Sequence, residues 1–200
     1  MININIEHEG DRMQKEFEYI EKFLYTEINK QKRFKNGVDL GCGTNRISDS
    51  IISIDAQGDP RYAHAQLVWD CHDLEIFSDN SLDFIFSSHC LEDFEDIPVV
   101  FLNWWRKLKA DGLMILLLPD MEKCDCDHCK GGIRYPTIED YQKTGKGNPS
   151  HKTNVGKKFI TDMLTDFYEK GKLKYEVLQQ DSIPHNVSCS IDFVIKKRGE

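Results

Sequence analysis

The chain has 200 residues, of which 40% are hydrophobic and 30% charged, the composition of an ordinary soluble globular domain. No apolar run approaches the roughly 18 residues that cross a bilayer, and the first residues lack a secretory signal, so we exclude a membrane protein and expect a cytoplasmic one. The formal net charge of −8 disfavours broad nucleic-acid binding, because the field of the whole molecule repels phosphates.

Apolar residues between Asp11 and about Arg33 recur at steps of three and four, which predicts an N-terminal helix. Asp11 suits the N-cap of this helix, and Asn36-Gly37 is a helix stop signal. We therefore interpret residues 1–36 as a helical extension of one domain that spans residues 1–200.

Beyond this helix, short apolar runs alternate with helical patterns. The predicted strands are 37–40, 51–55, 66–70, 82–87, 113–118, about 174–180 and 190–197, and the predicted helices lie near 61, between 97 and 108, and at 156–170. Alternation of strands and helices predicts a mostly parallel sheet covered on both faces, whereas two strands that follow each other directly form an antiparallel hairpin. The predicted fold is therefore α/β and Rossmann-like, with a mostly parallel seven-stranded sheet, helices on both faces and a C-terminal β-hairpin.

The segment 119–153 has no clear periodicity, and a segment of this length in a compact domain is typical of a lid or a substrate-binding insertion. It contains Cys124, Cys126, His128 and Cys129, which are ligand types that zinc favours. A single run of six residues rarely closes a tetrahedral site, so we predict no metal, and the question stays open.

The chain has seven cysteines, an odd number that does not suit a disulfide framework. Cys42, Cys71 and Cys90 lie inside or beside predicted strands. This placement favours reduced thiols.

Two glycines, Gly41 and Gly43, end the first strand of the predicted sheet. Glycine permits a tight turn there and lets a ligand approach the backbone closely. Asp39 lies on the same strand, and the second strand ends in Asp55. A carboxylate at the end of the second strand is where folds of this kind bind the hydroxyls of a ribose.

With these features, the chain resembles the class I S-adenosylmethionine-dependent methyltransferases from roughly Gly37 to Pro119, and weaker features continue to the C-terminus. The resemblance implies that S-adenosylmethionine is the cofactor. It implies that Asp55 binds the ribose and that Asp70, with the amide of Cys71, binds adenine; Asp73 is the alternative to Asp70. The full set of implied cofactor contacts is Asp39, Gly41, Cys42, Gly43, Asp55, Asp70, Cys71 and Ser87.

The chain departs from the family pattern at three points. Asn45 stands where the family often has a third glycine, and only about seven residues separate Gly43 from the second strand, too few for a full helix. Residues 81–93 resemble the family's fourth-strand segment, which commonly ends in His-Val-Leu-Glu-His. Asp93 stands where that segment has its second histidine, so a catalytic role is not carried over to this position.

Two histidines are candidates for the catalytic base. His89 lies at the carboxyl end of the predicted fourth strand, where open α/β sheets bind their ligands, and an imidazole suits proton transfer near neutral pH. His151 ends the segment 119–153, which is expected to fold over the same edge of the sheet. For each residue a purely structural role is the alternative.

The sequence therefore predicts an S-adenosylmethionine-dependent methyltransferase that acts on O or N of a small-molecule or sugar-like acceptor. The alternatives are a protein or RNA methyltransferase and a non-catalytic cofactor-binding subunit that needs a partner. We predict neither a membrane nor a nucleic-acid partner, and a homodimer stays open. The acceptor itself is not readable, because acceptor pockets in such folds come from variable segments.

Overall fold

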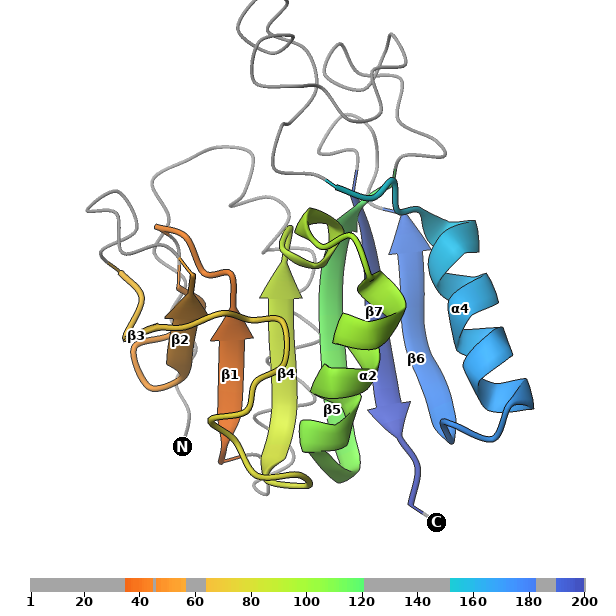
Figure 1. The fold of residues 1–200 in the computed structure, drawn as a ribbon, viewed down its shortest axis with the longest axis horizontal. Coiled ribbons are helices and arrows are strands. Elements are labelled where there is room, and N and C mark those ends of the chain that lie inside the picture. The colour runs from red at the N-terminus through yellow and green to blue at the C-terminus, as the bar shows by residue number, and fades with distance from the viewer. Residues whose placement is uncertain (1–34, 45, 57–63, 121–151, 183–189, 200) are drawn as a thin grey trace, which may run out of the picture.

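The computed structural model describes residues 35–44, 46–56, 64–120, 152–182 and 190–199. Their strands form one seven-stranded sheet in the order β3-β2-β1-β4-β5-β7-β6 (Figure 1). Strands β1 to β5 pair in parallel, whereas β7 is antiparallel to both β5 and β6. The predicted mostly parallel sheet with a C-terminal antiparallel hairpin is confirmed.

The observed bounds lie close to the predicted ones, with two exceptions. The elements are β1 Gly37–Leu40, β2 Ile52–Asp55, β3 Leu67–Val68, β4 Leu82–Ser88, the 3-10 helix η2 Leu91–Asp93, α2 Ile97–Lys107, β5 Leu108–Pro119, α4 Lys157–Glu169, β6 Tyr175–Ser182 and β7 Ser190–Lys197. Strand β5 begins five residues before the predicted start at Leu113, because Leu108 already pairs with Leu82 across an irregularity in the register. The short helix η2 was not predicted.

The inner strands of the sheet are buried on both of their faces. Helices α2 and α4 lie against one face, where Phe101 of α2 and Phe167 of α4 have ring centroids 6.2 Å apart (Figure 1). On β5, Met114 and Leu116 belong to this core, and Ile115 and Leu117 between them are equally buried. Successive side chains of a strand point to opposite faces, so β5 is the central strand that its unbroken apolar sequence predicts.

The parallel strands bring their carboxyl ends to one edge of the sheet. The turn after β1, the end of β2, the loop after β3 and the end of β4 therefore meet there, and these are the segments that carry the predicted site. The predicted N-terminal helix, the helix near residue 61 and the cysteine-rich segment lie outside the described residues. No helix in the described ranges is long and apolar enough to cross a membrane.

Candidate active site

The turn after β1 is closed against β2. The backbone N–H groups of Gly41 and Cys42 both donate to the carbonyl of Ile54, at 2.9 and 3.2 Å. Gly41 has φ +67°, and a Cβ built on it would lie 2.5 Å from Cβ of Cys90. Both the left-handed backbone and the close approach of Cys90, between β4 and η2, therefore require glycine here.

The second glycine of the turn is tied to the end of β2. The N–H of Gly43 donates to Oδ2 of Asp55 at 3.0 Å, and Gly43 also has a positive φ of 51°. Asp55 is half-buried. The structure therefore brings together two residues that the sequence predicts as cofactor contacts, and one of them orients the other.

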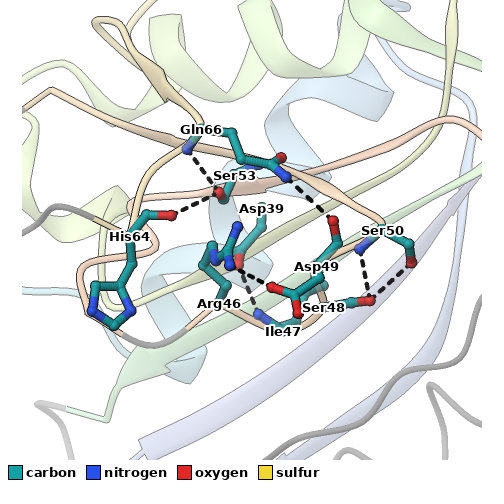
Figure 2. Close-up of polar contacts among 9 residues, drawn as sticks. All are labelled: Asp39, Arg46, Ile47, Ser48, Asp49, Ser50, Ser53, His64 and Gln66. Carbon is teal, nitrogen blue, oxygen red and sulfur yellow. Dashed lines mark hydrogen bonds and ion pairs between the residues drawn. The ribbon is translucent and has the colours of Figure 1, made fainter.

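Asp39 supports this turn from inside the protein. Its side chain is 2% exposed, and Oδ2 accepts a hydrogen bond of 3.0 Å from the N–H of Ile47 (Figure 2). Burial raises the pKa of Asp39 from its ordinary 3.8 to about 7, against the lowering effects of the Ile47 hydrogen bond and of Arg46. The observed contact of Asp39 is thus with the backbone that follows the turn.

The connection from β1 to β2 is held by polar side chains instead of a helix. Figure 2 shows Arg46 paired with Asp49 and the hydroxyl of Ser48 bonded to that of Ser50, 2.9 Å away. The described residues of this connection contain no helix, as their number predicts.

The loop after β3 is anchored to helix α2. The indole N–H of Trp104 donates to the carbonyl of Cys71 at 2.6 Å, and both residues are buried. Asp70 is exposed and accepts from the N–H of His72 at 2.8 Å, while Asp73 accepts from the N–H of Glu75 at 3.0 Å. Both acids therefore stabilise turns, and the choice between them for adenine stays a prediction.

Ser87, near the end of β4, supplies a buried polar atom without a partner. The residue is 1% exposed, and its Oγ has no hydrogen-bond partner in the described part of the chain. A buried hydroxyl of this kind costs stability unless a ligand or water satisfies it. Together with the glycine turn, it fits a bound cofactor that brings its own polar groups.

His89 follows β4 directly and is held at several points. Its φ is 52°, and its backbone N–H donates to the carbonyl of Leu117 at 3.0 Å. Nδ1 lies 3.3 Å from Oε1 of Glu92, and Nε2 lies 3.2 Å from Oγ of Ser190. The left-handed region is uncommon for residues other than glycine, and such residues gather at functional sites.

Helix η2 places two more acids beside His89. Glu92 is fully buried, and the pKa of Asp93 is raised to about 7 by burial first and by the charge of Glu92 second. The carbonyl of Glu92 accepts from the N–H groups of Lys152 and Thr153 at 2.9 and 3.0 Å. His151 lies outside the described residues, but the chain that follows it is thus bonded to η2.

The sequence reasoning missed Glu92 and Ser190. Glu92 could have been found, because it lies three residues after His89 and a single helical turn brings such positions together. Ser190 is 101 residues from His89 and has no local signal.

The predicted reduced state of the described cysteines is confirmed, since Cys42, Cys71 and Cys90 are free. Burial raises the pKa of the Cys42 thiol to about 12. The pKa of Cys90 is raised by a hydrogen bond with Cys71 and by burial. The thiols of Cys42 and Cys90 are therefore neutral and pack as apolar groups behind the turn.

Residues 38–116 match the family model described as a methyltransferase domain. Among proteins with curated functions, none matches this chain. The matched residues run from β1 into β5 and include the turn after β1, the end of β2, the loop after β3 and the end of β4.

Solved structures share the fold over nearly the whole chain. A protein from Pyrococcus horikoshii aligns with a TM-score of 0.60 at 15% identity, covering 94% of this chain and 93% of its own. A methyltransferase from Mesorhizobium loti aligns with a TM-score of 0.57 at 12% identity, covering 87% and 97%. One from Archaeoglobus fulgidus gives 0.53 at 15% identity, covering 92% and 98%.

The two latter structures are S-adenosylmethionine-dependent methyltransferases. The likeness of these structures shows the fold. The residues matched by the family model include the strands and turns that carry the predicted cofactor contacts. The chain therefore carries a methyltransferase domain over residues 38–116 and shares the fold of S-adenosylmethionine-dependent methyltransferases.

Proposed function

We propose that this methyltransferase transfers the methyl group to O or N of a small-molecule or sugar-like acceptor, and that His89 receives the acceptor's proton. The observation that carries the proposal is the location of His89. It follows β4 at the carboxyl edge of the sheet, beside the glycine turn, and its side chain is 29% exposed. It is therefore open to a ligand, while its backbone is fixed by Leu117.

The cofactor contacts in this proposal are the residues at that edge. Gly41, Cys42 and Gly43 form the turn that lets the cofactor approach the backbone. Asp55 binds the ribose, Asp70 and the amide of Cys71 bind adenine, and the hydroxyl of Ser87 bonds a polar group of the methionine part. Asp39 supports the cofactor site indirectly, because its carboxylate accepts a hydrogen bond from the backbone N–H of Ile47 behind the turn.

S-adenosylmethionine supplies a methyl group on a sulfonium, a leaving group that needs no acid. The protein's contribution is to align the acceptor and to exclude water. Held by the glycine turn and Asp55, the cofactor would supply its methyl group to the acceptor O or N. The proton of the acceptor passes to His89, whose imidazole suits this step near neutral pH.

A small acceptor is favoured over RNA by the net charge of −8. The segment 119–153 is our candidate for the acceptor pocket, and His151 is the second candidate for the base. The positions of the residues at the two ends of this segment support its role as the acceptor pocket. Pro119 ends β5 at the carboxyl edge, and Lys152 is bonded to η2 at that same edge.

The proposal is tested by transfer of label from methyl-labelled S-adenosylmethionine into separated pools of metabolites, protein and RNA. Label is expected in the metabolite pool. Asp55→Ala is expected to weaken cofactor binding by about 1 to 3 kcal/mol, because hydrogen bonds to a half-buried ribose are lost. Calorimetry with S-adenosylhomocysteine measures that loss directly.

The matched control is Asp162→Ala, which removes an exposed carboxylate from α4 and should leave both binding and transfer unchanged. Label found in protein or RNA alone would overturn the acceptor class. Absence of any cofactor binding at millimolar ligand would contradict the proposed roles of the site residues.

A further inference from the structure

The imidazole of His89 is held at both of its nitrogens by residues from different elements. Glu92 on η2 lies against Nδ1, with 3.3 Å between Nδ1 and Oε1. Ser190, the first residue of β7, lies against Nε2 at 3.2 Å. Strand β7 is antiparallel to β5, so its first residue lies at the same edge as the carboxyl ends of the parallel strands.

The chemistry of Glu92 decides which nitrogen carries the proton. An ionised carboxylate can only accept hydrogen bonds, so the nitrogen that faces it is the N–H of a neutral imidazole. With a carboxylate beside it, Nδ1 is the nitrogen expected to carry the proton, and Nε2 would keep its lone pair. A hydroxyl can donate, so the O–H of Ser190 bonds to that lone pair.

Burial makes the carboxylate of Glu92 an effective partner. Its side chain is 0% exposed, and a charge in such a place interacts strongly with a neighbouring ionisable group. The 3.3 Å between Nδ1 and Oε1 is the distance of an ion pair, and polar contacts of a catalytic site often tighten only when the substrate binds.

We propose that Glu92 is a positioning residue that keeps neutral His89 in the Nδ1–H tautomer, so that Nε2 is the atom that takes the acceptor's proton. The hydroxyl of Ser190 occupies Nε2 in the free enzyme and gives way to the acceptor O–H or N–H. When Nε2 is protonated, Glu92 stabilises the imidazolium. The role of Glu92 in the reaction rests on the proposed function of His89, whereas the tautomer can be measured without any acceptor.

Other charges near the ring also act on its titration. Asp93 on η2 interacts electrostatically with His89, with Glu92, with Asp55 of β2 and with Lys152, which is bonded to η2. The effect of Glu92 must therefore be measured by changing that residue alone.

The test is nuclear magnetic resonance of the full chain with ¹⁵N-labelled histidine. The signals of His89 are assigned by their loss in His89→Asn. In the wild type at high pH, we expect a protonated Nδ1 and an unprotonated Nε2. In Glu92→Gln, the titration midpoint of the ring should fall by about one pH unit or more, since a neighbouring negative charge is lost. Glu92→Asp should restore most of the midpoint.

The matched control is the exposed pair of His72 and Asp96, in which Nε2 lies 3.0 Å from Oδ2. Asp96→Asn should change the signals of His72 and leave those of His89 unchanged. An Nε2–H tautomer of His89 in the wild type would overturn the proposal, and this measurement needs no variant of Glu92 to fold. An unchanged midpoint in folded Glu92→Gln would overturn it as well.

Failure of this inference is distinguishable from failure of the proposed function. Calorimetry with S-adenosylhomocysteine on the same samples measures cofactor binding. This binding is expected to be the same whichever nitrogen of His89 carries the proton.

Discussion

Gly41 and Gly171 have the same backbone conformation in different surroundings. Both have φ +67°, but a Cβ on Gly41 would meet Cβ of Cys90 at 2.5 Å, whereas nothing lies within 4 Å of one on Gly171. Gly171 follows the end of α4, where a left-handed glycine commonly ends a helix. A comparison of alanine variants at the two positions therefore distinguishes the cost of a positive φ from the cost of steric crowding.

We expect Gly41→Ala to destabilise the protein by about 1 to 3 kcal/mol more than Gly171→Ala, because only the former forces an atom into a packed site. Urea denaturation of both variants measures the difference. Gly41→Ala should also lose affinity for S-adenosylhomocysteine, since the turn must move away from Cys90. Equal destabilisation of the two variants would contradict the steric argument.

The sequence predicts the location of Asp39 but not the partner of its side chain. Its place on β1 is evident from the sequence, and the resemblance implied a cofactor contact. The side chain points to the face of β1 opposite to Val38 and Leu40 and bonds the backbone N–H of Ile47. A sequence gives the alternation of a strand but not the path of the loop that covers one of its faces.

At the scale of elements, helix α2 does more than cover the sheet. Trp104 packs in the core and donates to the carbonyl of Cys71, so the helix fixes the loop that follows β3. Asn103 adds a bond from its amide to the carbonyl of His72 at 3.2 Å. The predicted adenine contacts thus depend on a helix that begins about 25 residues later in the chain.

Trp104→Phe should cost about 1 to 3 kcal/mol for the unsatisfied carbonyl of Cys71, in addition to the loss of packing. It should also weaken binding of S-adenosylhomocysteine, because the loop loses its anchor. Trp105→Phe is the control, since Trp105 is also buried but stacks on Phe101, 5.8 Å away. Urea denaturation and calorimetry compare the two, and equal losses in both measurements would count against the anchor.

At the scale of the whole molecule, the free energy of unfolding depends on pH because acids are buried at the carboxyl edge of the sheet. In the folded protein the pKa of Asp39 is about 7, whereas its ordinary value is 3.8. Between these values the folded chain keeps a proton that the unfolded chain has released. The free energy of unfolding therefore falls as pH rises through this window. Asp93, with a pKa also of about 7, acts in the same direction.

Asp39→Asn removes the ionisable group and can keep the hydrogen bond to Ile47. Between pH 4 and pH 8 we expect the variant to gain stability relative to the wild type by up to about 4 kcal/mol, the equivalent of the pKa difference of Asp39. Chemical denaturation at a series of pH values measures this gain. Asp162→Asn on the exposed face of α4 should keep the wild-type pH dependence, and an equal dependence in Asp39→Asn would refute the assignment to Asp39.

The sequence by itself determined the α/β class, the order of the described strands along the chain, most of their bounds and the turn around Gly41 and Gly43. These features are local: strand patterns repeat every two residues, helical patterns every 3.6, and glycine marks positive φ. The same local signals brought the resemblance to the family. The predicted start of β5 at Leu113 was wrong, because the structure already pairs Leu108 with Leu82 of β4.

Only the tertiary structure decided which side chains meet. The contacts of Trp104 with Cys71 and of His89 with Ser190 join residues 33 and 101 positions apart. Such contacts depend on the order of the strands in the sheet, which places β7 between β5 and β6 and is not encoded by local periodicity. The burial of Asp39 and Glu92 likewise follows from which segments pack over the sheet. Burial matters because it disfavours the charged form of a carboxyl group.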